Sequence, residues 1–336
     1  FDWFGRVFWC SHVVIKSLRM KVLIVDQMHE SILGLLEKYG FEVTYAPKIT
    51  REAIFEQIGS YDGIIIRSKT PLDRELLEQA TRLHFIGRAG AGLDQLDLDY
   101  LEERGVALFH AAKGNRDAVA EHALGGLLAL FNHLAQADQQ VRKGIWDREG
   151  NRGVELKGKT VGIFGYGNMG KAFAKRLKGF GVNVLAYDKY KKDFGNKWVQ
   201  EVNWETLKQE ADVLSIHVPL TAETRDFFTL EELNSFSKPF WLINTARGEV
   251  IRMETLNQAL DQGILKGVVL DVLENEKFER FSPEQKLQFE LLAKRENVLF
   301  TPHVAGWTVE SYQKINEVLV KQILQTFGKQ LHNFID

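Results

Sequence analysis

The sequence predicts an α/β protein with two doubly wound parallel-sheet domains, one inserted into the other. Short apolar runs of strand type alternate with helical segments along most of the chain, as parallel sheets covered by helices on both faces require. The 336 residues suffice for two hydrophobic cores. A glycine-rich turn lies near the middle, so one complete α/β domain is expected inside another.

The first domain is predicted to begin directly after Met20. Its strands are expected over 21–25, 42–46, 63–67 and 84–87, and its helices over 31–38, 51–58 and 73–80. Residues 1–19 are crowded with aromatics but lack the order of a signal peptide. We interpret them as a non-native or disordered extension, with a short membrane-surface anchor as the alternative.

A long helix, from Asp117 to about Val141, is predicted to carry the chain into the second domain. Strands near 160, 182, 212, 241, 267 and 297 follow. The final helix, from Val309 to about Phe327, comes after this second sheet and is expected to return to the first domain. The predicted boundaries are 20–117 with 308–336, and 118–307. Two crossings of this kind predict a hinged cleft.

The glycine-rich turn has the spacing of a dinucleotide fingerprint. Gly165, Gly167 and Gly170 follow a strand at 160–164 and open a helical pattern, and Asp188 ends the next strand about twenty residues later. Each glycine alone could serve an ordinary turn. The order strand, loop, helix and strand instead predicts a Rossmann domain, with the Asp188 carboxylate on the adenosine ribose and NAD favoured over NADP.

Composition narrows the range of partners. The formal net charge is −2, which gives no electrostatic reason to expect a nucleic acid or an anionic membrane as a partner. Cys10 is the one cysteine, so an intramolecular disulfide is excluded and a reducing, cytoplasmic location is expected. No apolar stretch is long enough to span a bilayer.

Reactive side chains follow three later strand-like runs: Arg247 in LINTARGEV, Asp271 and Glu276 in GVVLDVLENE, and His303 in FTPHVAGWT. The carboxyl ends of parallel strands line one crevice, so these groups are expected to converge. Singly they could be a surface ion-pair partner, a solvated acid and a structural histidine. Together they suit the oxidation of a 2-hydroxy acid: a cation holds the carboxylate, and an imidazole with an acidic partner moves the hydroxyl proton.

From Met20 onward the chain resembles the D-isomer-specific 2-hydroxyacid dehydrogenase family. The matching stretches include FIGRAGAGLDQLDLD, GNRDAVAEHALGGLLAL, LKGKTVGIFGYGNMG, IHVPLTAETR, LINTARGEV, LDVLENE and TPHVAGWT. The resemblance implies a flavodoxin-like first domain that binds substrate. It also implies that Arg247 orients the substrate carboxylate, that His303 is the general acid and base, and that Glu276 is its partner.

The resemblance further implies binding residues and no metal. NAD would be lined by Gly165, Gly167, Asn168, Met169, Gly170, Asp188, Val218, Pro219, Thr245, Ala246, Asp271 and Gly306. Substrate would be lined by Arg67, Ser68, Arg88, Gly90, Ala91, Gly92 and Asn115. The sequence departs from the family at Ala91, where Thr is frequent, and at the NRD that follows Gly114.

The resemblance implies a phosphorylated 2-hydroxy acid as the substrate, D-3-phosphoglycerate, which would be oxidised to 3-phosphohydroxypyruvate as in serine biosynthesis. Arg67, Lys69 and Arg88 are the candidates for its phosphate, although these cations could instead pair with local carboxylates. The alternatives are a glyoxylate or hydroxypyruvate reductase and, from another class, an NAD(H)-sensing protein similar to corepressors. No C-terminal effector domain is expected.

A homodimer is expected through the arm formed by residues 130–159. This stretch is too long for a simple connection and contains Ile145 and Trp146 among basic residues. In the family it packs against the partner across a two-fold axis. A surface arm packed on its own subunit is the alternative.

Overall fold

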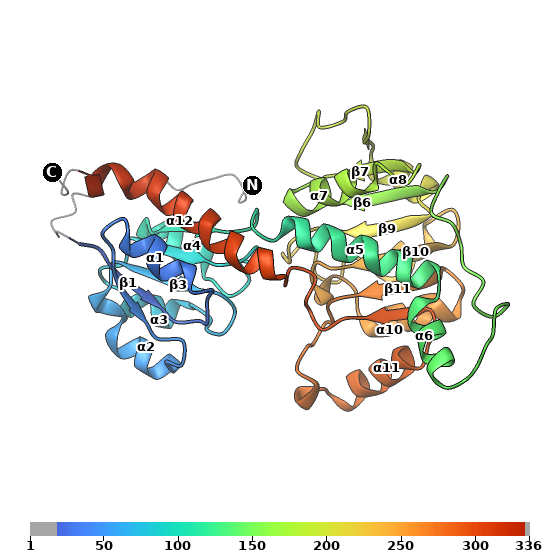
Figure 1. The fold of residues 1–336 in the computed structure, drawn as a ribbon, viewed down its shortest axis with the longest axis horizontal. Coiled ribbons are helices and arrows are strands. Elements are labelled where there is room, and N and C mark those ends of the chain that lie inside the picture. Colours follow the sequence, from blue (N-terminus) through green and yellow to red (C-terminus); the bar gives the residue numbers. More distant parts are fainter. Residues whose placement is uncertain (1–18, 333–336) are drawn as a thin grey trace. The chain divides into compact units, whose positions relative to one another are not determined.

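A computed structural model describes residues 19–332, which form two compact units (Figure 1). The first unit ends at Asn115 and resumes at Thr308, and the second spans Arg116–Trp307. Except for Arg19, the predicted N-terminal extension lies outside the described residues. No helix of the described part is long and apolar enough to cross a membrane.

The first unit contains a five-stranded parallel sheet of order β2-β1-β3-β4-β5. This is the flavodoxin-like order. Its strands are β1 (Lys21–Ile24), β2 (Glu42–Tyr45), β3 (Gly63–Ile66), β4 (Phe85–Arg88) and β5 (Ala107–His110), and its helices are α1 (Ser31–Glu37), α2 (Arg51–Gln57), α3 (Arg74–Gln79), α4 (Leu98–Arg104) and α12 (Val309–His332).

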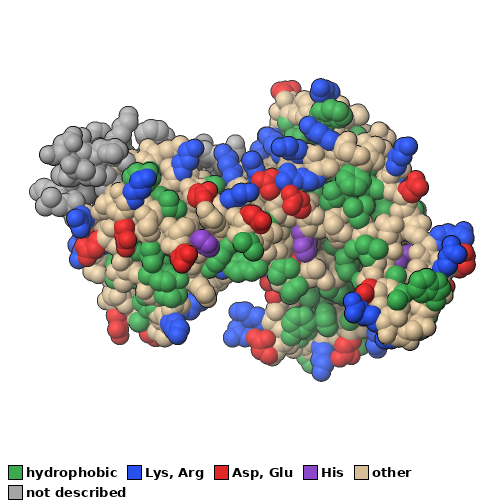
Figure 2. All heavy atoms as spheres, in the orientation of Figure 1, with side chains coloured by type: hydrophobic (Ala, Val, Ile, Leu, Met, Phe, Trp, Pro, Cys, Tyr) green, Lys and Arg blue, Asp and Glu red, His purple; other side chains and the backbone are tan. Residues whose placement is uncertain are grey.

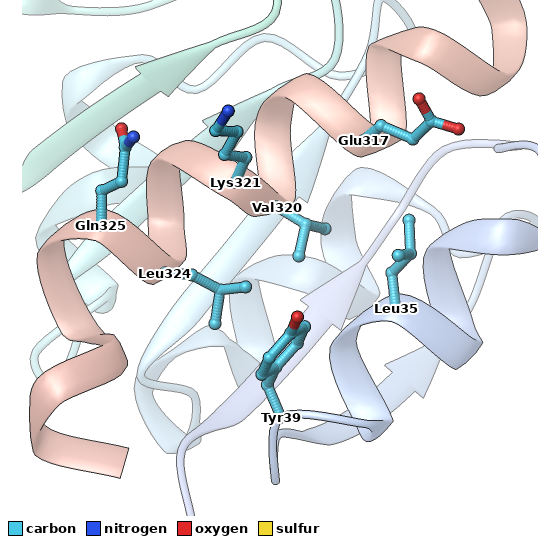
Figure 3. A pocket seen from close by; sticks show the side chains of 7 residues that line it. All are labelled: Leu35, Tyr39, Glu317, Val320, Lys321, Leu324 and Gln325. Atoms are coloured by element: carbon cyan, nitrogen blue, oxygen red, sulfur yellow. The ribbon is translucent and has the colours of Figure 1, made fainter. Parts of the chain in front are cut away.

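Helices cover both faces of this sheet. On one face α1 and α12 pack over a core that includes Phe85, Phe109 and Leu319. On the other face α2, α3 and α4 pack over the strand residues Ile64, Ile66 and Ile86. An open groove between α1 and α12, lined by Leu35, Tyr39, Glu317, Val320, Lys321, Leu324 and Gln325, holds none of the predicted site residues (Figure 3).

The second unit contains a seven-stranded parallel sheet of order β12-β11-β10-β9-β6-β7-β8. Its strands are β6 (Thr160–Phe164), β7 (Asn183–Tyr187), β8 (Gln200–Glu201), β9 (Val213–Ile216), β10 (Phe240–Asn244), β11 (Leu265–Leu270) and β12 (Val298–Phe300). Its helices are α5 (Arg116–Phe131), α6 (Leu134–Arg142), α7 (Asn168–Leu177), α8 (Trp204–Glu210), α9 (Leu230–Asn234), α10 (Met253–Asp261) and α11 (Pro283–Ala293).

Strand β6 is the first of this sheet in sequence, and it pairs with β7 on one side and β9 on the other. The strand order therefore reverses at β6, and the carboxyl ends of β6 and β9 border the crevice where such sheets bind ligands. Helices α5 and α7 cover one face, and α8, α9 and α10 cover the other. The predicted fold class is confirmed.

Two element predictions were wrong. The first domain was given four strands, but β5 and the helix α4 before it complete its sheet. The helix predicted over 117–141 is two helices, because His133 adopts a left-handed conformation with φ of 50°. The Asn132 side chain also donates to the carbonyl of Leu128 and satisfies the end of α5. Beyond this break, α6 buries none of its residues.

Candidate active site

The glycine fingerprint joins β6 to α7, and its three glycines meet different surroundings. Gly165 has φ of 96°, and a Cβ there would lie 2.8 Å from the carbonyl oxygen of His217. A Cβ at Gly170 would lie 2.2 Å from the carbonyl oxygen of Gly165, so helix and turn touch. A Cβ at Gly167 would meet only the Lys191 ammonium, 3.8 Å away. Two glycines therefore shape the turn, and the third leaves space above it.

The start of α7 fits an anionic ligand. Asn168 and Met169 are its first residues, and no side chain caps the helix at Gly167. Free backbone amides at a helix N-terminus attract phosphate groups. Nearby, after β10, the Oγ1 of Thr245 is buried and has no hydrogen-bond partner within the described residues. Both features fit a dinucleotide along the edge of the sheet.

Asp188 follows β7 and lies beside the glycine loop. One carboxylate oxygen accepts the amide of Tyr166, inside the fingerprint, at 2.8 Å. The other oxygen accepts the amides of Tyr190 at 3.1 Å and Lys191 at 3.0 Å. The carboxylate thus fixes the loop and keeps lone pairs for a diol. Lys189, the cation adjacent in sequence, pairs with Glu223 at 2.8 Å.

Val218 and Pro219 follow β9, and Val218 lies against Gly165: a Cβ on that glycine would be 2.8 Å from the Cγ1 of Val218. Ala246 and Arg247 follow β10 in a turn held by the fully buried side chain of Asn244. Its Oδ1 accepts the amide of Ala246 at 3.0 Å, and its Nδ2 donates to the carbonyl of Arg247 at 2.9 Å. This turn fixes the backbone of Arg247, whose guanidinium donates back to the carbonyl of Ala246 at 2.7 Å.

His303 and Glu276 form a hydrogen-bonded pair. The Nδ1 of His303 lies 2.9 Å and 3.0 Å from the two Glu276 carboxylate oxygens, and about half of each side chain is exposed. The hydrogen bond that His303 donates to Glu276 raises the pKa of His303 above its ordinary value. Burial and the charge of Arg247 oppose this shift, and the charge of Asp271 adds to it. The imidazolium form is therefore favoured, and Nε2 is the ring nitrogen not used by Glu276.

Asp271 is 1% exposed and lies under the turn that bears His303. Its carboxylate accepts the hydroxyl of Thr301 and the amides of Val304 and Ala305, and its carbonyl accepts the amide of His303. The observed contacts of Asp271 thus hold residues 301–305, the segment directly before Gly306. Its predicted contact with NAD stays a prediction.

In the first unit, Arg67, Ser68 and Lys69 follow β3 in a loop held by Asp26. The carboxylate of Asp26, 3% exposed, accepts the amide of Arg67, the amide of Ser68 at 3.1 Å and that of Lys69 at 3.4 Å. The Arg67 guanidinium lies over the ring of Tyr312 at 5.6 Å, and burial lowers its pKa. The Lys69 ammonium donates to the carbonyls of Pro47 and Ile49.

The other predicted substrate residues are also in the first unit. Arg88 ends β4, and its guanidinium turns back to donate to the carbonyl of Ala89 at 2.8 Å. A Cβ at Gly90 would lie 2.1 Å from this guanidinium, so a larger residue there would displace the end of the Arg88 side chain. Ala91 and Gly92 follow. Asn115 is the last residue before the second unit, and its buried Oδ1 lacks a hydrogen-bond partner within the described residues.

The sequence did not indicate Asp26, Asn244 and Tyr312 as parts of these sites. Asp26 carried a detectable signal, since a carboxylate directly after the first buried strand lies at the ligand-facing edge of a parallel sheet. Asn244 lies within the LINTARGEV stretch but resembles any residue at a strand end. Tyr312 lies 245 residues from Arg67 in sequence, and only the packing of α12 places its ring beneath the Arg67 guanidinium.

The chain matches known proteins over nearly its whole length. Residues 124–305 match the NAD-binding domain of the D-isomer specific 2-hydroxyacid dehydrogenases. The chain is 33% identical over 317 residues to a D-3-phosphoglycerate dehydrogenase of Methanocaldococcus jannaschii, covering 93% of this chain and 58% of that protein. It is 32% identical over 311 residues to a hydroxypyruvate reductase of Thermotoga maritima, covering 92% and 99%.

Solved structures share the fold. A D-lactate dehydrogenase of Aquifex aeolicus, in complex with NAD and lactic acid, has a TM-score of 0.78 and 27% identity, with 94% of this chain and 97% of that chain covered. A glyoxylate reductase of Paecilomyes thermophila has a TM-score of 0.80 and 26% identity, with 92% and 95% covered. The chain spans under two thirds of the length of the archaeal phosphoglycerate dehydrogenases it matches.

Proposed function

Because the chain belongs to the D-isomer-specific 2-hydroxyacid dehydrogenase family, we propose that it is an NAD-dependent enzyme that interconverts a D-2-hydroxy acid and its 2-keto acid. The observation that carries the proposal is the pair of His303 and Glu276, joined at 2.9 Å in a unit that matches the NAD-binding domain of this family. When bound, NAD accepts the hydride that leaves C2 of the hydroxy acid.

His303 is proposed to move the proton. During oxidation, its Nε2 takes the hydroxyl proton while Nδ1 stays bonded to Glu276, and during reduction Nε2 returns that proton to the carbonyl oxygen. Glu276 stabilises the imidazolium that forms and fixes the plane of the ring. The raised pKa of His303 favours the protonated ring that reduction requires.

Arg247 is proposed to bind the substrate carboxylate. The positive charge of Arg247 opposes the rise in the pKa of His303. The guanidinium and the imidazole therefore interact electrostatically. A guanidinium can hold a carboxylate through two parallel hydrogen bonds, which would orient C2. Asn244 supports this role by fixing the backbone of residues 246 and 247.

We propose D-3-phosphoglycerate as the substrate, with Arg67 and Arg88 as ligands of its phosphate. The similarity to two archaeal D-3-phosphoglycerate dehydrogenases supports this choice, but a hydroxypyruvate reductase and a glyoxylate reductase are nearly as similar. Lys69 is the weaker candidate for the phosphate, because its ammonium already donates to two backbone carbonyls.

The test is NADH oxidation with a panel of 2-keto acids, with and without a phosphate group. The proposal expects 3-phosphohydroxypyruvate to give the highest kcat/KM, and expects Arg67→Ala to lower that value while hydroxypyruvate is affected little. Equal use of both acids would favour the reductase alternative. Tight NADH binding with no turnover of any acid would favour a dinucleotide-sensing protein instead.

We also propose that the arm, residues 130–159, forms a homodimer interface. Helix α6 buries no residue, and Leu134, Val141, Ile145 and Trp146 are all exposed, with Trp146 at 78%. Large apolar side chains at this exposure mark interaction surfaces. Arg142, Lys143 and Arg148 are close to Ile145 and Trp146 in sequence, as expected for an apolar anchor with a charged rim.

A further inference from the structure

His122 lies in the middle of α5 and contacts the segment that bears His303. Its Nε2 is 2.9 Å from the Oγ1 of Thr301, a residue 179 positions later in the chain. The same nitrogen is 3.7 Å from the nearer carboxylate oxygen of Asp271. Three quarters of the His122 side chain is buried, so the contact is shielded from water.

Chemistry fixes the direction of this chain of hydrogen bonds. The carboxylate of Asp271 can only accept, so the Thr301 hydroxyl, 2.6 Å away, uses its single proton toward Asp271. In its remaining contact, with His122, the hydroxyl oxygen must then accept the hydrogen bond. Nε2 of His122 is therefore the donor, and the order runs from His122 through Thr301 to Asp271.

Asp271 is the point at which this chain reaches His303. Its second carboxylate oxygen accepts the amide of Ala305 at 2.8 Å, and its carbonyl accepts the amide of His303 at 2.8 Å. His303 has φ of 54°, a conformation that is costly for a residue with a Cβ and persists only where surrounding contacts impose it. Among the contacts that hold this segment, the carbonyl of Asp271 accepts the amide of His303 itself, and its carboxylate accepts the amides of Val304 and Ala305 directly after it.

We propose that His122 is a positioning residue for the reaction assigned above: by donating to Thr301 it keeps the Thr301 hydroxyl directed at Asp271, and so keeps His303 in its left-handed backbone conformation facing Glu276. The inference rests on the proposed role of His303. His122 itself is assigned no contact with substrate. A donor at Nε2 also lies close enough to the buried Asp271 to offset part of the cost of burying its charge.

Paired substitutions separate the hydrogen bond from packing. Thr301→Val removes the hydroxyl and keeps the shape, and Thr301→Ser keeps the hydroxyl. His122→Leu removes the donor, and His122→Gln places an amide donor near the position of Nε2. For each variant we would measure kcat and KM, NADH affinity by fluorescence, the melting temperature, and the titration of the His303 ring by NMR.

The proposal expects Thr301→Val and His122→Leu to lower kcat roughly tenfold to a hundredfold, since small misplacements of a reacting group have effects of this size. KM and NADH affinity should stay within about twofold, because the fingerprint is untouched. The His303 ring should titrate at lower pH than in the parent protein, because its bond to Glu276 is weakened. Thr301→Ser and His122→Gln should restore both properties, and Thr301→Val with His122→Leu together should cost little more than either alone.

Two results would overturn the inference. One is unchanged kcat and unchanged His303 titration in a folded His122→Leu protein. The other is an equal loss of kcat in Thr301→Ser and Thr301→Val, which would show that packing at this position matters and the hydroxyl does not. If the parent protein turned over no 2-keto acid, the proposed function would fail, but the NMR titration would still report whether His122 controls the His303 conformation.

Discussion

At the scale of single residues, the proposed chemistry depends on two side chains that the sequence places 27 positions apart. His303 and Glu276 meet because the segments after β12 and β11 lie at the same edge of the sheet. Replacing His303 by Ala should lower kcat by about 10² to 10⁴, the usual contribution of a positioned proton donor. NADH affinity, measured by fluorescence, should be nearly unchanged. Near-normal turnover would remove His303 from the mechanism.

Glu276→Gln should change the pH dependence of reduction. The Glu276 hydrogen bond raises the pKa of His303, and reduction needs the protonated ring, so the rate falls as pH rises through that pKa. Without the carboxylate charge the pKa drops, and the fall should begin at lower pH. Rates of NADH oxidation across the pH range test this. A profile identical to that of the parent protein would make Glu276 a structural residue.

Asp188→Ala should weaken NADH binding and narrow the preference for NADH over NADPH. The substitution removes an acceptor for the ribose and the repulsion of a 2′-phosphate. It also releases the amide of Tyr166, so the fingerprint should loosen. Asp188→Asn keeps an acceptor for that amide and serves as the control for the loop. Dissociation constants for both cofactors give the answer, and an unchanged ratio would place Asp188 away from the ribose.

Residues proposed to contact substrate or cofactor are easier to predict from sequence than the residues that position them. Arg247 and His303 belong to short, chemically unusual segments at strand ends, and their order along the chain is informative. Asn244, Asp26 and His122 act through backbone amides or through one hydroxyl far away in sequence. No spacing rule connects such partners, because only the three-dimensional packing defines them.

At the scale of elements, the turn between β6 and α7 allows a matched pair of substitutions. Gly170→Ala places a Cβ 2.2 Å from the carbonyl oxygen of Gly165 and should destabilise the fold by about 1–3 kcal/mol. Gly167→Ala meets only a flexible lysine at 3.8 Å, so stability should change little while NADH binds more weakly. Thermal melting and NADH titration separate the two effects. Unchanged NADH affinity in Gly167→Ala would mean that the dinucleotide does not pass over this loop.

Helix boundaries were predictable where the chain faces a core and not where it leaves one. The apolar spacing of α5 predicted its buried face, including Leu127 and Phe131. Beyond Phe131 the pattern continues in sequence, but no core lies beneath it. The chain then turns at His133, and α6 lies exposed.

At the scale of the whole molecule, alternation of strands and helices predicted two parallel sheets and the insertion of one in the other. It missed β5, the edge strand of the first sheet, whose four residues form a short apolar run without clear boundary residues. It also missed β8 of the second sheet and gave no bounds for α8, α9, α10 and α11. Helix α11 has a capping box at Ser282 but buries only Leu292, so its amphipathic signal is weak.

Trp146→Ala should shift the protein from dimer toward monomer, because the anchor of the proposed interface is lost. Sedimentation at low protein concentration measures this, and Trp198→Ala, another exposed tryptophan of the second unit, is the matched control. If a basic residue of the arm helps to hold the phosphate in the partner, KM for the phosphorylated acid should rise more than KM for glyoxylate. A fully dimeric Trp146→Ala protein with unchanged preference would show that the arm serves its own subunit.

The division of the first unit into two chain segments also sets an order of synthesis. The ribosome completes residues 116–307 before it makes α12, yet α12 supplies Ile315, Leu319 and Ile323 to the core over β4 and β5. The second unit can therefore close its core while the part of the first sheet that α12 covers is still exposed. During that interval Phe85 and Phe109 lack the Phe327 ring that packs against both of them, which makes the nascent chain vulnerable to aggregation and dependent on chaperones until α12 is made.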